Sequence, residues 1–195
     1  SVGQFPLNGV LALSYSMDSL GFFVRDPGDL QLLRNILLNQ SSSIGPLQPR
    51  KVGLVRTPYW SELDDASRSI LETVQNNLSA AGVEVDEVEV DGYQGTDLVH
   101  AHKTVLAYEA SRTRVVEYEN YVEQLSKQFF DLIEQGRQID HAQYREALKQ
   151  RDAANRRLNT ELAHYDLFLT PSALGEAPHG LSSTGDPVFS RAWNL

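Results

Sequence analysis

The 195-residue sequence contains no cysteine. This absence excludes disulfides, a cysteine nucleophile and thiolate metal ligands. The sequence also lacks any apolar run near the roughly 18 residues that a membrane span needs, and its first residues have neither the basic start nor the apolar core of a signal peptide. We therefore expect a soluble, cytoplasmic protein with no membrane partner.

Basic residues are scarce, with 17 Lys and Arg against 26 Asp and Glu, and the formal net charge is −9. Nucleic-acid affinity depends largely on Lys and Arg side chains that neutralise phosphates, so a nucleic-acid partner is not expected. The composition, 41% hydrophobic and 22% charged, is that of a globular protein. The length favours one core, and we predict a single domain over residues 1–195.

Local patterns predict the first elements of the chain. The short apolar run at 10–13 suits a strand. Asp26 and Pro27 precede leucines at helical spacing, which predicts a helix with Asp26 as its N-cap and Pro27 as its first residue. Serine, glycine and proline at 41–50 break both periodicities and predict an internal linker before a strand at 51–56.

Residues 51–90 read as a strand, a helix and a second strand. Apolar residues recur every three or four positions through 61–81, Gly82 stands where the helix would stop, and valines return from 83 to 90. This order predicts a right-handed parallel crossover. Acidic residues alternate with those valines, which predicts that they form a solvated strand face. They are Asp86, Glu87, Glu89 and Asp91.

The second half of the sequence predicts long helices over about 97–165, broken near 136–140, and then a buried strand at 166–170. A loop rich in glycine, proline and serine follows at 171–186, and loops of that length are often functional. The fold class is therefore α/β.

The residues alone supply no complete catalytic site. His100 and His102 are two positions apart and cannot form the i, i+4 pair of a zinc helix. Ser182 lacks both the closing glycine and the strand-turn-helix context of a nucleophile elbow. No glycine-rich phosphate or dinucleotide loop occurs. We predict no catalytic residue, no metal and no cofactor in this chain.

The stretch VLALSYSMDSLGFFVRDPGDLQLLR resembles the part of amidase-signature hydrolases that follows their serine-rich catalytic loop. Met17, Ser19 and Phe22 stand where the family usually has leucine, threonine and proline. The resemblance implies that Asp18, Gly21 and Arg25 are structural motif residues. The matching positions are Gly3, Pro6, Ser14, Ser16, Asp18, Gly21, Arg25 and Asp29.

The resemblance extends through KVGLVRTPYW, through Tyr108-Glu109-Ala110 and through the spaced Tyr144, Ala147 and Arg151. YDLFLTPSALGEAP is similar to a family strand that ends in Thr-Pro beside the substrate cleft, and TGDPVFSRAWNL to the start of the following helix. Structural roles are expected for Glu109, Arg151 and Pro171. Glu109 and Arg151 would either form a buried pair or each face solvent.

The resemblance implies part of the amidase-signature fold, a mixed β-sheet flanked by α-helices. It also implies an amide hydrolase that uses a Ser–cis-Ser–Lys triad on a small linear amide or carboxamide. In that family the triad lies upstream of the matching stretch, so this chain is expected to be a partial amidase domain, inactive alone, that supplies scaffold and pocket wall. The expected substrate-binding residues are Thr170, Ser172 and Trp193, although Thr170 could simply end a strand and Trp193 could belong to the core.

Two other interpretations stay open. One is a non-catalytic binding or assembly module derived from the amidase fold. The other is a helical protein that binds a partner through residues 97–165. A partial fold would expose apolar sheet edges, so it is expected to self-associate or to pair with the missing part of the fold, whereas a stand-alone helical protein would be monodisperse.

Overall fold

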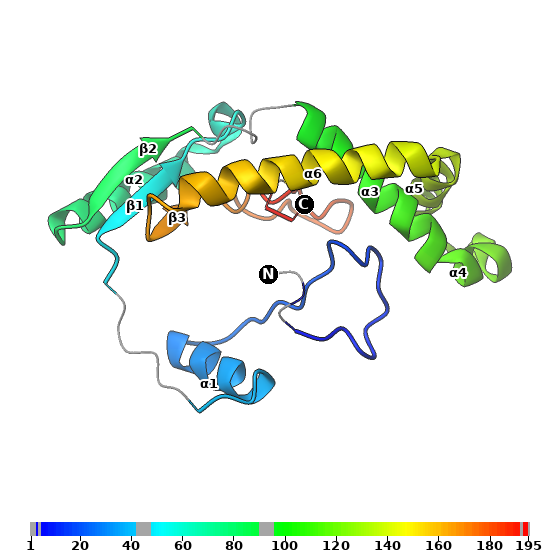
Figure 1. The fold of residues 1–195 in the computed structure, drawn as a ribbon, viewed down its shortest axis with the longest axis horizontal. Coiled ribbons are helices and arrows are strands. Elements are labelled where there is room, and N and C mark those ends of the chain that lie inside the picture. The colour runs from blue at the N-terminus through cyan, green and yellow to red at the C-terminus, as the bar shows by residue number, and fades with distance from the viewer. Residues whose placement is uncertain (1–2, 4, 42–47, 90–95, 192, 195) are drawn as a thin grey trace. The chain divides into compact units, whose positions relative to one another are not determined.

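The computed structural model describes residues 3, 5–41, 48–89, 96–191 and 193–194 (Figure 1). The chain divides into two compact units, one formed by residues 1–48 and 106–137 and the other by residues 49–105 and 138–195. Most of the expected linker at 41–50, namely residues 42–47, lies outside the described part. The expectation of a single domain stays a prediction.

The first unit is helical. Its elements are α1 (Pro27–Leu37), the second half of α3 (Thr96–Thr113), α4 (Val115–Asn120), the 3-10 turn η2 (Val122–Gln124) and α5 (Lys127–Gln138). The start of α1 confirms the prediction, because the Asp26 carboxylate accepts the backbone N–H groups of Gly28 at 2.7 Å and Asp29 at 3.3 Å. Pro27 opens the helix, where a missing N–H costs nothing.

The strand predicted at 10–13 is wrong, because these residues form turns and irregular chain. Their backbone groups bond to side chains instead of to a neighbouring strand. Asp18 accepts the N–H groups of Leu13 and Ser14, and the Leu13 carbonyl accepts the hydroxyl of Thr113 on α3 at 2.8 Å. Of the four residues, Ala12 is buried, whereas Val10 and Leu11 are exposed.

Helices α3 and α5 cross closely at Gly136. A Cβ atom at Gly136 would overlap the carbonyl oxygen of Ala107, so only glycine allows this approach. Arg112 of α3 also donates to the Gly136 carbonyl at 3.2 Å. The break predicted near 136–140 therefore does not begin at Gly136, which lies inside α5. It falls just before Asp140, which caps α6 (His141–Leu162).

The second unit contains a three-stranded sheet of β1 (Lys51–Val55), β2 (Glu84–Val88) and β3 (Leu167–Leu169) in the order β2-β1-β3. The 3-10 turn η1 (Trp60–Glu62) and α2 (Asp65–Ala80) connect β1 to β2, so the predicted strand-helix-strand order is confirmed. All described strands are parallel, whereas a mixed sheet was expected. Figure 1 shows α2 beside the sheet and α6 as the longest helix.

The two faces of the sheet carry different clusters. Gly53, Val55, Val88 and Phe168 lie on one face, because β1 pairs Gly53 with Phe168 and Val55 with Val88. Phe168 lies over Gly53, where an added Cβ would come within 2.6 Å of its ring. On the other face Leu71, Leu63, Val188 and Phe189 form a second buried cluster, against which Leu169 packs.

Two predictions about strand burial need correction. The strand at 166–170 is not fully buried, because β3 is an edge of the described sheet and Leu167 is 42% exposed. The acidic residues of β2 do not share one solvated face either. Asp86 lies beside Lys51 and Glu87 beside Arg56, on opposite faces, and each forms an ion pair. Asp91 lies outside the described residues.

Candidate functional site

A shallow pocket opens where β3 ends in the second unit. After Leu169 the chain passes through Thr170, Pro171 and Ser172 beside the first turns of α2. This "Thr170 pocket" has a volume of about 220 Å³. The structure thus brings together three residues that the sequence analysis singled out. The full lining is Ser67, Ile70, Leu71, Thr170, Pro171, Ser172, Ala173 and Gly175.

Asp64 ties the pocket loop to the start of α2. As the N-cap, its carboxylate accepts the N–H of Ser67 at 2.7 Å, and its own N–H donates to the carbonyl of Leu174 at 2.9 Å. Gly175 packs so closely on Asp64 that a Cβ would overlap the carboxylate. Hydrogen bonds from Ser67, and a weaker one from the backbone of Glu176, hold the pKa of Asp64 below its usual range. The carboxylate next to the pocket is therefore ionised at neutral pH.

The pocket is chemically simple. Its lining consists of apolar side chains and of three hydroxyl groups, those of Ser67, Thr170 and Ser172. The Thr170 hydroxyl is buried and has no hydrogen-bond partner among the described residues, while Ser172 is exposed. Among the described residues, no charged side chain, and no histidine or lysine that could act as a base, lines the pocket. Such a surface can hold a small neutral group but cannot activate a nucleophile.

Sequence reasoning did not identify Ser67, Ile70 and Leu71 as pocket residues. Leu71 and Ile70 belong to the helical periodicity of α2, which by itself indicates only packing. Ile70 is nevertheless 63% exposed. No local pattern in the sequence marks Ile70 as a residue that faces a neighbouring loop.

Trp193 does not line the Thr170 pocket. Its ring packs against Phe168, with ring centroids 6.3 Å apart, in the cluster that contains Val55 and Val88. Leu71 of the pocket belongs instead to the cluster that Leu169 joins. Consecutive strand residues point to opposite faces, so Trp193 and the pocket lie on opposite sides of β3. The structure therefore brings Thr170 and Ser172 together, but not Trp193.

The motif segment 11–18 is anchored by side chains in the first unit. Glu109 of α3 is only 7% exposed, and its carboxylate accepts the Ser14 hydroxyl at 2.6 Å and the Ser16 N–H at 3.0 Å. Arg114 donates to the Leu11 carbonyl at 2.6 Å. One alternative held that Glu109 faces solvent, and the structure contradicts it. Segment 11–18 is thus fixed against α3 by charged groups.

Asp18 completes this anchoring. Its carboxylate accepts the N–H groups of Leu13 at 2.7 Å and Ser14 at 3.1 Å, and its own N–H donates to the Ser14 carbonyl. A carboxylate that accepts two successive N–H groups in this way closes a tight local turn. The structure therefore places Asp18 as the brace of a turn, with both of its acceptor contacts made to backbone.

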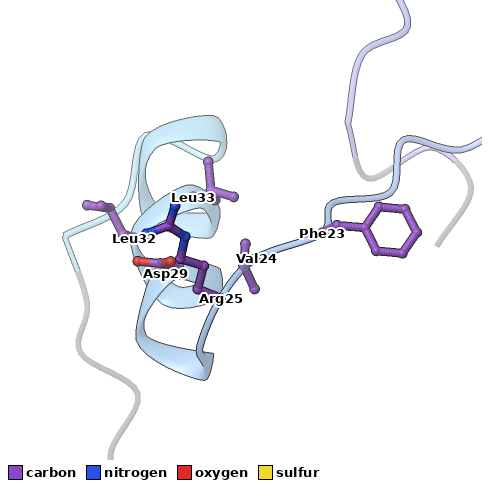
Figure 2. Close-up of a pocket in the computed structure, with 6 residues that line it drawn as sticks. All are labelled: Phe23, Val24, Arg25, Asp29, Leu32 and Leu33. Atoms are coloured by element: carbon purple, nitrogen blue, oxygen red, sulfur yellow. The ribbon is translucent and has the colours of Figure 1, made fainter.

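The other motif residues are scattered. Gly21 is exposed, with no atom near the position of a Cβ. Arg25 lies on a wide, open depression beside α1 with Asp29 and apolar neighbours (Figure 2). In the second unit, Arg151 pairs with the adjacent Asp152 through Nε at 3.1 Å and a terminal nitrogen at 3.0 Å. Arg151 is not among the residues that line the Thr170 pocket.

The lysines show no sign of a catalytic base. Lys51 lies 2.8 Å from Asp86 and 2.7 Å from Glu84, and these carboxylates, Asp86 foremost, raise the pKa of Lys51. It therefore stays protonated at neutral pH. Lys127 and Lys149 pair with carboxylates one turn away on their own helices. Throughout the described ranges, no hydrogen bond joins a lysine to a serine.

His102 is partly buried on α3 in the second unit. Burial, and secondarily the charge of Arg191, lowers the pKa of His102, so the ring is neutral at pH 7. The described residues include no cluster of three His, Asp or Glu side chains that could hold a metal ion. Within the same ranges, every helix is too short or too polar to cross a bilayer.

Comparison with known proteins decides the family. The family model described as Amidase matches residues 1–194. The chain belongs to the amidase family. A crystal structure of an amidase aligns with a TM-score of 0.82 and 26% identity, covering 93% of this chain and 41% of the other. A bacterial aryl acylamidase of the amidase-signature family, 14% identical with a TM-score of 0.57, covers 75% of this chain and 34% of its own, and shares the fold.

Two curated relatives match the amidase chain at about the same identity as the first of these structures. 2-Amino-5-chloromuconic acid deaminase of Comamonas testosteroni is 24% identical over 186 residues, which is 91% of this chain and 40% of the relative. Mandelamide hydrolase of Pseudomonas putida is 25% identical over 119 residues, which is 60% of this chain and 23% of the relative. The amidase chain therefore spans less than half the length of the proteins it matches.

Proposed function

We propose that this amidase chain is part of an enzyme that hydrolyses the C–N bond of a small linear carboxamide, and that it supplies scaffold and pocket wall while the catalytic triad lies outside residues 1–195. One observation carries the proposal. The chain belongs to a hydrolase family, yet its described residues contain no serine hydrogen-bonded to a lysine. This observation supports the proposal that other residues carry out the chemistry.

The names of the two relatives support the reaction class. One acts on mandelamide, a carboxamide, and the other is a deaminase. Both names describe removal of nitrogen from carbon. Since this chain matches only 40% and 23% of their lengths, either relative has ample chain outside the match to hold a triad.

In the proposed mechanism, a neutral lysine takes a proton from a bridging serine, which in turn takes the proton of the nucleophilic serine. That serine attacks the amide carbon, and backbone N–H groups stabilise the oxyanion. The bridging serine passes the nucleophile's proton to the departing amine and takes its own proton back from the lysine. Water then hydrolyses the acyl-enzyme, which releases the acid and restores the nucleophilic serine. The role of this chain is to hold the substrate substituent in the Thr170 pocket while the reacting groups meet.

The test is an assay of the complete gene product with primary carboxamides, mandelamide among them. We expect ammonia and carboxylic acid in equal amounts, and loss of turnover after treatment with a fluorophosphonate, which blocks a nucleophilic serine. A protein that binds these amides but releases no ammonia would contradict the proposal and would support a non-catalytic binding module.

A further inference from the structure

We propose that the Thr170 pocket selects a neutral, apolar substituent of the substrate, of about phenyl size, and rejects an anionic one. This inference rests on the function proposed above, because it treats the pocket as the subsite for the substrate substituent. It names a substrate class that family membership leaves open. The pocket's lining, its neighbouring charge and its volume each support it.

No cationic side chain lines the pocket in the part of the chain that the structure describes. Ile70, Leu71, Pro171 and Ala173 present hydrocarbon, and the remaining polar side chains are hydroxyl groups. Arg68 lies on the same helix, but its guanidinium donates to the carbonyls of Trp60 and Leu63 and does not line the pocket. A carboxylate bound here would lose water without gaining a positive partner.

The charge beside the pocket is negative. Asp64 contacts Gly175, a lining residue, and the hydrogen bonds from Ser67 keep its carboxylate ionised. The whole chain has a formal net charge of −9, so the distant field has the same sign. An anionic substituent would therefore meet repulsion as well as desolvation.

The volume and the buried hydroxyl define the preferred substituent. An apolar cavity of roughly 150 Å³ holds a benzene molecule, so a pocket of about 220 Å³ has room for a phenyl ring. The Thr170 hydroxyl is buried without a partner among the described residues. A buried hydroxyl gains by pairing, so a neutral hydrogen-bonding atom near the ring would add affinity.

The experiment compares two amides that differ by one charge, phenylacetamide and 4-carboxyphenylacetamide, with the complete gene product. We expect kcat/KM to favour the neutral amide by at least about tenfold, because like charges at close range cost several-fold or more in binding. Ser172→Lys places a cation at the pocket and should reduce or reverse this ratio. Ser79→Lys adds the same charge at the exposed far end of α2 and should leave the ratio unchanged.

Equal shifts in the two lysine variants would overturn the pocket assignment, because the effect would then come from net charge alone. Equal kcat/KM values for the two amides in the unmodified protein would overturn the selectivity. If no amide is hydrolysed, the proposed function fails, and saturation-transfer NMR with the same amides and variants tests the pocket separately. A binding preference for the neutral amide that Ser172→Lys reverses and Ser79→Lys does not would support the pocket assignment. The absence of such a preference would refute it.

Discussion

Segment 11–18 of the first unit and strand β1 of the second are both short and apolar, but their backbones are held in different ways. Side chains hold the first, since Glu109 and Thr113 of α3, Arg114 just after α3, and Asp18 each bind a group of the segment. Backbone ladders to β2 and β3 hold the second. Substitution of one side chain should therefore weaken segment 11–18 directly, whereas β1 keeps its backbone ladders when a side chain is changed.

Gly136 of the first unit and Gly53 of the second are both tightly packed, but against different kinds of neighbour. Gly136 meets a backbone carbonyl, that of Ala107, which cannot move without shifting α3. Gly53 meets the ring of Phe168, which is a side chain and can rotate or shift. The comparison therefore predicts that the same glycine-to-alanine change costs more in the first unit than in the second.

The largest effect is expected for Gly136→Ala. The new methyl would overlap the Ala107 carbonyl, so α3 and α5 must separate, and we expect a loss of about 3 kcal/mol or more in the free energy of unfolding. Urea denaturation measures it. Gly21→Ala is the control, since nothing lies within 4 Å of the new methyl. Equal losses in the two variants would mean that the helices do not cross as described.

Glu109→Ala should have the next largest effect on the free energy of unfolding. The change leaves the Ser14 hydroxyl and the Ser16 N–H without their acceptor, and we expect a loss of about 2–4 kcal/mol. Glu109→Gln keeps one acceptor oxygen and should lose less. Hydrogen exchange of the Ser16 amide gives the local measurement, and Glu119→Ala, an exposed residue of α4, is the matched control. An unchanged Ser16 exchange rate would contradict the side-chain anchoring.

Gly53→Ala should have a smaller effect, about 1–3 kcal/mol, because Phe168 can give way to the new methyl. Near-ultraviolet circular dichroism would report the altered packing of Phe168 and Trp193, whose rings are in contact. A loss larger than that of Gly136→Ala would reverse the comparison between the two units.

The smallest predicted effect is the pH dependence of the stability that Asp166 contributes. The Asp166 carboxylate accepts the N–H groups of Lys51 at 3.0 Å and Arg50 at 2.6 Å, and these bonds hold the pKa of Asp166 below its usual range. Its stabilising contribution is therefore present above the ordinary aspartate pKa and is lost as pH falls through the lower, folded value. The difference in Tm between the native chain and Asp166→Asn should shrink from pH 7 to pH 3. A constant difference would contradict the role given to the charge.

Local sequence patterns predicted the elements whose causes are local. The Asp26 cap and Pro27 determine the start of α1, and the spacing of apolar residues predicts α2 and its two strands. Segment 11–18 could not be predicted this way, because its partners Glu109 and Thr113 lie about a hundred positions away. In the sequence, Gly136 looks like a helix break, but in the structure it allows α5 to pack closely against α3.

The candidate site was predicted in part. Thr170 and Ser172 came from family resemblance, and they line one pocket. Trp193 came from the same resemblance but packs on the other side of β3. Strand register, and not proximity in sequence, decides which face of the strand a side chain contacts. Ile70 belongs to the pocket only because the loop after β3 returns to α2, a long-range contact with no sequence signal.

The most direct test of the account is to find the nucleophile. The complete gene product is labelled with a fluorophosphonate, digested, and the modified serine located by mass spectrometry. The account predicts one labelled serine, outside residues 1–195, and no label on Ser14, Ser16 or Ser182. A stoichiometric label on any serine within these residues would contradict the central claim that this chain supplies scaffold and pocket wall without the reacting group.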